Sequence, residues 1–180
     1  MKKILIASIV FSMLFLLTIR GYRGNPSAEQ IDNQLNGSGQ AFETSQERSR
    51  YGIILALVNY HRFDLGEYAS MGTPDIGQIN GKYYSFFPPA ASIIAIPLYL
   101  LGLRLGAAQI FTFLLPTIFA LATIIMIYSF MRSLNIHWSK AFFAAIAFCF
   151  ATNAWGYSVT LYAHLLSAFA IVAGIYYATI

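Results

Sequence analysis

The sequence predicts an all-α polytopic transmembrane protein with one large external loop that contains interfacial amphipathic helices. All seven carboxylates lie in a single hydrophilic stretch from Glu29 to Asp75, whereas apolar runs fill 4–19 and most of 88–180. Acidic side chains are costly in hydrocarbon, so this confinement is typical of a membrane protein with one aqueous segment. With 58% hydrophobic and 10% charged residues, the chain is also too apolar for a soluble domain of 180 residues.

The N-terminal run predicts a signal-anchor transmembrane helix at 1–20. Lys2 and Lys3 precede sixteen uncharged residues, and no small-x-small cleavage pattern follows them. A cleaved signal peptide is the alternative, but the length of the run favours an anchor. Because basic flanks stay on the cytoplasmic side, we expect a cytoplasmic N-terminus in a bacterial plasma (inner) membrane.

Later apolar runs predict transmembrane helices at 107–131, 141–155 and 158–180. A spanning helix needs about 20 apolar residues, and the first and last of these runs meet that length. The middle run is slightly short and could span with its polar end at the interface. We expect the region 107–180 to continue into further membrane helices.

The stretch 21–106 is predicted to form one external loop. The basic segment 132–140 should be cytoplasmic like the N-terminus, so an even number of crossings must separate the two. The N-terminal helix and 107–131 supply these crossings. The run at 88–103 is short and contains three prolines, so we expect it to lie in the membrane interface. Arg104 would then lie on the external side, although basic residues prefer the cytoplasmic side of a membrane.

A second interfacial helix is expected within the loop, at about 45–65. Tyr51, Ile54, Leu55 and Val58 follow helical spacing, with polar residues on the other positions. An amphipathic helix of this kind should lie on the membrane surface.

Two segments of the loop resemble the first external loop of GT-C glycosyltransferases, the polytopic enzymes that take a sugar from a polyprenyl-phosphate donor. The first is the charged segment Glu47-Arg48-Ser49-Arg50-Tyr51. The second, Gly81-Lys82-Tyr83-Tyr84-Ser85-Phe86-Phe87-Pro88-Pro89-Ala90-Ala91, is similar to the family's Gly-x-Tyr-Tyr-Ser-x-x-Pro-Pro-Gly segment. The resemblance covers 43–180. It implies the N-terminal portion of an aminoarabinose- or protein-mannosyl-transferase-like enzyme, with a glycan, lipid or protein as acceptor.

The chain departs from that family in both segments. The family often has Asp-Glu-x-Arg-Tyr, whereas here Glu47 stands at the Asp position and Arg48 at the Glu position. Ala90 replaces the usual Gly. The first departure leaves the identity of the catalytic acid open.

Glu47 and Asp75 are the candidate catalytic carboxylates, and each has a structural alternative. Glu47 could deprotonate an acceptor hydroxyl, or it could complete the capping box Thr44-Ser45-Gln46-Glu47 at a helix start. Asp75 follows a proline in Thr73-Pro74-Asp75, so it could be the base or only a turn residue.

Cations and tyrosines of the same segments are candidate substrate-binding residues. Arg48, Arg50 and Lys82 could neutralise and hydrogen-bond the donor phosphate, or they could contact solvent or lipid head groups. Tyr51 and Tyr84 are the substrate contacts that the resemblance implies. All five lie in or beside the two segments that carry it.

His164 is a further candidate for substrate binding, because it is an ionisable residue well inside a late apolar run. Its structural alternative is a neutral imidazole that hydrogen-bonds near the outer surface, where Tyr157 and Tyr162 are its neighbours. Both interpretations place it within about two helical turns of that surface.

The sequence carries no metal-binding motif, so the cofactor is unassigned and a divalent cation is left open. His61 and His137 lie by loops without further ligands at metal spacing, and Cys149 is the one cysteine. Basic residues flank apolar runs instead of forming a patch. This argues against a nucleic-acid partner and favours membrane lipid.

A non-enzymatic alternative is a transporter or an assembly subunit whose external loop binds a partner. Transporters carry polar or broken helices near the bilayer midplane. In this chain the polar residues concentrate in the external loop, which favours glycosyl transfer.

Overall fold

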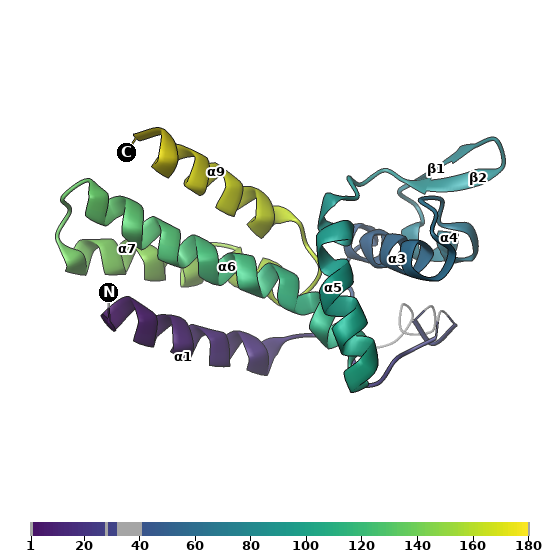
Figure 1. Cartoon of the computed structure of the whole chain (residues 1–180), viewed down its shortest axis with the longest axis horizontal. Helices are drawn as coiled ribbons and strands as arrows, with labels where there is room; N and C mark the ends of the chain where they lie inside the picture. The colour runs from purple at the N-terminus through teal and green to yellow at the C-terminus, as the bar shows by residue number, and fades with distance from the viewer. Residues whose placement is uncertain (1, 28, 32–40, 180) are drawn as a thin grey trace. The chain divides into compact units, whose positions relative to one another are not determined.

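A computed structural model describes residues 2–27, 29–31 and 41–179, with side chains from residue 9 onward. These residues are mostly helical, with one small two-stranded antiparallel sheet (Figure 1). The helical class predicted from the sequence is therefore confirmed, with the sheet as an addition. Part of the predicted external loop, residues 28 and 32–40, lies outside the described residues.

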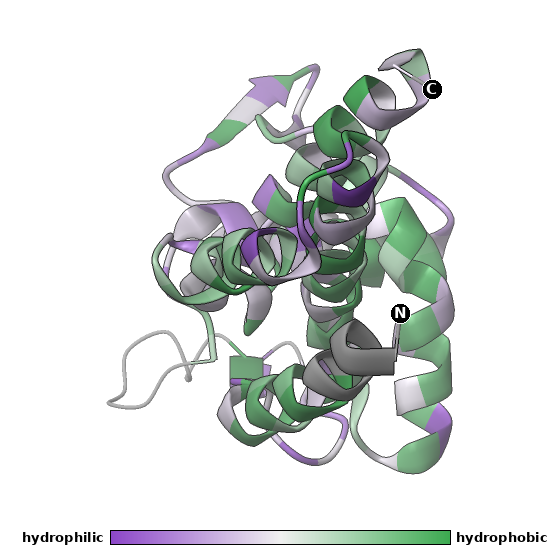
Figure 2. Ribbon diagram, turned by 90° about the vertical axis from the view of Figure 1, so that its left-hand side faces the viewer, coloured by the Kyte–Doolittle hydropathy of each residue, from purple (hydrophilic) through white to green (hydrophobic). Residues whose placement is uncertain are grey.

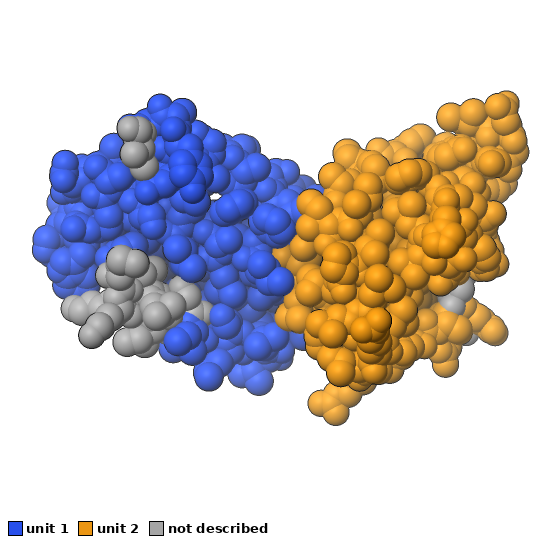
Figure 3. Space-filling view, viewed as in Figure 1, with its two compact units in different colours: residues 1–19, 116–180 blue, residues 20–115 orange. Residues whose placement is uncertain are grey.

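The chain divides into two compact units (Figure 3). Unit 1 comprises residues 1–19 and 116–180, and unit 2 comprises residues 20–115. The boundary between them falls inside helix α6 (Ala108–Ser133), just before Pro116.

Unit 1 is built from apolar helices joined by short turns. Besides the second part of α6, they are α1 (Lys2–Thr18), α7 (Trp138–Phe150), α8 (Ala154–Ser158) and α9 (His164–Thr179). The sequence placed helices at 141–155 and 158–180, so the break after α7 and the late start of α9 were not predicted.

Hydroxyl groups explain the break after α7. The Thr152 hydroxyl donates to the Phe148 carbonyl oxygen (2.6 Å) and accepts the backbone N–H of Ala154 (3.1 Å). Such local bonds compete with the helical ladder, so the chain bends although its composition stays apolar.

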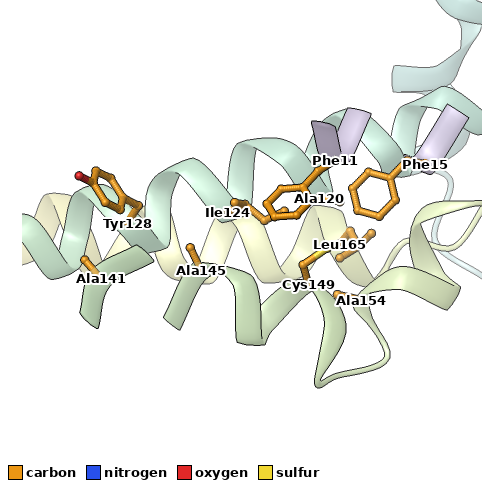
Figure 4. Packing of buried hydrophobic residues seen from close by; sticks show 10 residues of the cluster. All are labelled: Phe11, Phe15, Ala120, Ile124, Tyr128, Ala141, Ala145, Cys149, Ala154 and Leu165. Atoms are coloured by element: carbon orange, nitrogen blue, oxygen red, sulfur yellow. The ribbon is translucent and has the colours of Figure 1, made fainter. Parts of the chain in front are cut away.

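The core of unit 1 combines small side chains, mostly alanine, with large apolar and aromatic ones, including two rings from α1 (Figure 4). Phe11 packs edge-on against Phe150 and Phe15 against Trp155, with ring centroids 5.3 and 5.1 Å apart. The buried cluster comprises Phe11, Phe15, Ala120, Ile124, Tyr128, Ala141, Ala145, Cys149, Ala154 and Leu165.

Many of the large apolar side chains of unit 1 are exposed. The exposed residues are Ile9, Val10, Met13, Leu16, Leu17, Ile118, Ile125, Leu134, Trp138, Phe143, Phe150, Ile171, Ile175 and Tyr177. Hydroxyl groups are buried instead: Thr117 donates to the carbonyl oxygen of Ser158 at 2.6 Å. Alanine and hydroxyl-bearing side chains in the interior let helices approach closely, which is also a feature of helices that pack together in lipid.

One described helix, α6, is long and apolar enough to cross a membrane, with 26 residues and a mean hydropathy of 2.5. The other apolar helices of the described chain have 10–17 residues. Figure 2 shows hydrophobic residues along most of the helical ribbon. Helix length alone therefore does not establish the predicted polytopic topology.

Unit 2 surrounds one helix, α3 (Ser45–Tyr60), with shorter elements. These are the 3-10 turn η1 (Gly66–Tyr68), α4 (Ala69–Gly72), strands β1 (Ile76–Ile79) and β2 (Lys82–Ser85), α5 (Ala90–Leu105) and the first two turns of α6.

Helix α3 differs from the amphipathic surface helix that the sequence predicted at about 45–65. Every residue from Ser49 to Ala56 is buried, because α4 and the sheet cover one side of α3 and α5 covers another. It ends at Tyr60, where His61 adopts a left-handed conformation. The spacing of Tyr51, Ile54, Leu55 and Val58 indicated one apolar face, but the packing buries the polar residues Ser49 and Arg50 as well.

The two strands form a hairpin that the sequence analysis missed. Asn80 and Gly81 connect them with φ values of 51° and 76°, the backbone of a tight two-residue turn. Asn-Gly is the strongest local hairpin signal, but it lies at the start of the segment that was compared with the glycosyltransferases.

A tight corner joins α5 to α6. Gly106 ends α5 with φ 65°, and its carbonyl oxygen accepts the backbone N–H of Gly24 (2.7 Å). The Asn25 side-chain amide donates to the Leu103 carbonyl oxygen (2.9 Å). The segment at 21–26 thus caps the end of α5, which begins and ends two residues later than the predicted 88–103.

Gly102 and Gly174 provide a test of this packing. A Cβ at Gly102 would lie 2.7 Å from the Phe111 Cβ and 2.9 Å from the Ala107 carbonyl oxygen, whereas a Cβ at Gly174 would meet nothing within 4 Å. Overpacking costs about 1–3 kcal/mol, more than the roughly 1 kcal/mol that Ala gains over Gly in a helix. We expect Gly102→Ala to lower the Tm of the detergent-solubilised chain and Gly174→Ala to leave it unchanged or raise it. Equal Tm values for both variants would contradict the described corner.

Candidate functional site

The first turn of α3 is built around a buried carboxylate. Glu47 is completely buried, and its Oε1 accepts the backbone N–H groups of Thr44 (2.9 Å) and Glu43. The capping box predicted from Thr44-x-x-Glu47 is therefore confirmed. These bonds satisfy backbone donors that the helix itself leaves without acceptors.

Asp75 meets the same turn from a distant part of the chain. The Ser45 hydroxyl donates to Asp75 Oδ2, and the backbone N–H of Asp75 donates to the Gly72 carbonyl oxygen at 2.8 Å. Asp75 is half-buried, whereas Glu47 is completely buried. The structure thus brings both candidate acids, Glu47 and Asp75, to one end of α3.

Arg48 connects these two segments. Its Nε donates to the Thr44 carbonyl oxygen (3.2 Å) and its Nη2 to the Thr73 carbonyl oxygen (3.3 Å). The guanidinium is half-buried and lies beside the turn that carries Asp75. A fixed cation next to a partly exposed carboxylate can bind an anionic group while the carboxylate accepts a proton.

A pair of serines, which sequence reasoning missed, ties the hairpin to α3. The Ser49 and Ser85 hydroxyl oxygens are 2.6 Å apart, and Ser85 Oγ also accepts the backbone N–H of Phe87 (3.0 Å). Ser85 belongs to the Tyr-Tyr-Ser segment, and Ser49 lies in Arg48-Ser49-Arg50. The two segments that carry the glycosyltransferase resemblance are therefore in direct contact.

Arg50 and Tyr51 lie in the core of unit 2. Arg50 is buried with its guanidinium carbon 5.2 Å from the Phe87 ring centroid. Tyr51 packs among aromatic rings, 5.5 Å from Phe42 and 5.9 Å from Tyr99. Its burial raises the pKa of the Tyr51 phenol far above the usual value. Because both side chains are buried, neither presents a surface to a substrate.

Lys82 and Tyr84 lie on β2, and Lys82 is near the other end of α3. Lys82 Nζ is 3.9 Å from Asp64 Oδ2, and Arg62 Nε is 3.5 Å from Asp64 Oδ1. Tyr84 is half-buried opposite Gly77 in the sheet. The sequence grouped Lys82 with Arg48 as candidate phosphate ligands, whereas the structure places Arg48 at the start of α3 and Lys82 beside Asp64, after its end.

A hydrogen bond joins Tyr60, the last residue of α3, to Glu67 in the following turn η1. Tyr60 donates its hydroxyl to Glu67 Oε1 at 2.6 Å. This bond raises the pKa of Tyr60 to about 12 and lowers the pKa of Glu67 below its usual value. Both groups are solvent-exposed, so the pair orders this end of the loop without a large contribution to stability.

His164 belongs to unit 1, where it is the first residue of α9. Its ring lies 4.4 Å from the Tyr157 ring centroid and 5.6 Å from that of Tyr162. The aromatic neighbours expected from the sequence are thus in contact with His164, which is exposed.

Across the part of the chain that the structure describes, no group of three or more His, Cys, Asp or Glu side chains could hold a metal ion. No protein-family model matches the chain, and no curated protein or solved structure matches it either. The polar groups that could take part in chemistry are therefore Ser45, Arg48 and Asp75, at the start of α3.

The cap formed by Glu47 predicts how substitutions at this residue change the free energy of unfolding. Glu47→Ala leaves two backbone N–H groups without their acceptor, which costs about 1–3 kcal/mol when such groups are buried. Glu47→Gln keeps a carbonyl oxygen in place, so it should lose about half as much, since charge-assisted bonds are roughly twice as strong as neutral ones. Denaturant unfolding of the detergent-solubilised chain measures both. A wild-type stability for Glu47→Ala would show that the cap is dispensable.

Proposed function

We propose that this chain forms part of a membrane glycosyltransferase that moves a sugar from a polyprenyl-phosphate donor to the hydroxyl group of an external glycan, lipid or protein. The observation that carries the proposal is the half-buried Asp75, whose carboxylate accepts the Ser45 hydroxyl, two residues from the Thr73 carbonyl oxygen that binds the Arg48 guanidinium. An acid and a cation at one surface are the groups that such a transfer requires.

Membrane placement is supported by the residue distribution in unit 1. Large aliphatic and aromatic side chains of α1, α6, α7 and α9 are exposed, while alanine and hydroxyl-bearing side chains are buried. In water, an exposed apolar surface of this extent would favour association. In lipid it is the surface that contacts acyl chains, and small buried residues let the helices approach closely.

Asp75 suits the role of general base better than Glu47 does. Glu47 is fully buried and its Oε1 already accepts two backbone N–H groups, so an acceptor hydroxyl cannot reach it without unwinding the start of α3. Asp75 is only half-buried, and its carboxylate accepts a hydrogen bond from the Ser45 hydroxyl. A base must lie within hydrogen-bond reach of the proton that it removes.

The proposed transfer is a single displacement. The acceptor hydroxyl oxygen attacks the anomeric carbon of the donor sugar as its proton passes to the Asp75 carboxylate. The bond between that carbon and the phosphate oxygen breaks, and polyprenyl phosphate leaves with the electron pair. Arg48 stabilises the charge that develops on the departing phosphate.

Asp75→Asn keeps an acceptor for the Ser45 hydroxyl but cannot take up a proton at neutral pH. In membranes that contain the full-length enzyme, we expect sugar transfer from a polyprenyl-phosphate donor to fall by about 100-fold or more, the scale for loss of a general base. Glu47→Gln is the matched control and should keep most of the turnover. The reverse result, with Glu47→Gln inactive and Asp75→Asn active, would make Glu47 the base.

The proposed topology places the hairpin outside and the α6–α7 turn in the cytoplasm. Gln78 on β1 and Ser133 at the end of α6 are both exposed, so each can be replaced by cysteine for labelling. In intact cells an impermeant maleimide should label Gln78→Cys and leave Ser133→Cys unlabelled until the membrane is opened. The parent chain gives the background, because Cys149 is buried. Labelling of Ser133→Cys alone would invert the topology.

A further inference from the structure

Unit 1 contains a groove that the proposed transfer reaction does not use. It has a volume of about 270 Å³ and lies between the end of α7, α8 and the start of α9. The residues that line it are Phe148, Thr152, Asn153, Ala154, Tyr157, His164, Leu165 and Ala168. Pockets for whole small molecules usually measure about 300–1,000 Å³, so this groove fits only part of a larger ligand.

The lining of the groove is divided by chemistry. Phe148, Leu165 and Ala168 offer an apolar surface, and Leu165 is also a member of the buried core. Asn153 and His164 offer polar groups and are both exposed. A ligand that follows this division has a hydrocarbon portion and a polar head.

The polar end favours an anionic head. The Asn153 amide and the His164 imidazole both carry N–H donors, even when the imidazole is neutral. The seven carboxylates of the chain all lie between Glu29 and Asp75, so unit 1 has no acidic side chain that would repel an anion. The Tyr157 and Tyr162 rings pack against the His164 ring, with centroids 4.4 and 5.6 Å away.

We propose that this groove binds an anionic membrane phospholipid, with the phosphate at Asn153 and His164 and one acyl chain along Phe148, Leu165 and Ala168. The proposal rests on the membrane placement of unit 1 and not on the transfer reaction. Tyrosine and tryptophan side chains are typical of the head-group level of a bilayer, and Trp155 and Tyr157 lie in the adjoining α8.

Trp155 provides a direct reporter, because it follows Ala154 in the wall of the groove. Trp138 is the second tryptophan of the chain, so Trp138→Phe leaves Trp155 as the sole indole signal. This background chain would be placed in phosphatidylcholine vesicles, and a fixed fraction of the lipid would be replaced by phosphatidylglycerol or phosphatidylcholine with brominated acyl chains. Bromine quenches only nearby indoles, so quenching of Trp155 measures lipid occupancy.

We expect brominated phosphatidylglycerol to quench Trp155 more strongly than brominated phosphatidylcholine at the same fraction. His164→Ala should reduce this preference by roughly 10-fold or more, the effect of losing one hydrogen bond to a charged group. Ala168→Leu should reduce it as well by filling the apolar end of the groove. His137→Ala, at the opposite end of α7, is the matched control and should retain the preference.

Equal quenching by the two brominated lipids in the background chain would overturn the proposal without reference to any variant. An unchanged preference in both His164→Ala and Ala168→Leu would place the lipid elsewhere. Displacement of the brominated lipid by inorganic phosphate alone would show a phosphate site in which the acyl chain has no part. Absence of quenching by either lipid would contradict the membrane placement itself.

Discussion

The arrangement of unit 2 depends on one buried carboxylate. Glu47 accepts two backbone N–H groups at the start of α3 and fixes the first turn of a helix that is surrounded by protein. Three residues at the start of α3 can then reach other segments: Ser45 contacts Asp75, Arg48 contacts Thr73, and Ser49 contacts Ser85. A capping interaction, which is local by nature, therefore sets the position of groups that are far apart in the sequence.

The sequence could predict only those parts of the site that depend on residues close together in the chain. The Thr44-x-x-Glu47 spacing predicts a cap because the two side chains act within one turn. The contact between Ser45 and Asp75 has no comparable signal, since 30 positions separate them and each residue type is common in turns. The burial of Arg50 could not be predicted either. A charged residue is expected to be exposed unless the ring that it packs against, here Phe87, is known.

For the apolar helices too, composition predicts one property and packing decides another. The apolar runs predicted the existence of the helices, but polar side chains inside those runs decided where they end. Helix α7 has 13 residues, a length of about 20 Å, whereas a bilayer core is about 30 Å thick. The distribution of small and large side chains is a different kind of information, because it reports the medium that surrounds the helices and not the distance that they cover.

The hairpin turn has a practical consequence for imaging. Asn80 and Gly81 form a solvated tip, and a Cβ at Gly81 would meet no atom within 4 Å. Exposed loop tips of this kind accept inserted sequences, because the backbone bonds of the strands on either side remain intact. A short epitope placed between these residues would give an antibody fragment a firm attachment to the two strands. Such a fiducial would supply the asymmetric mass that a small helical protein lacks when particles are aligned in electron micrographs.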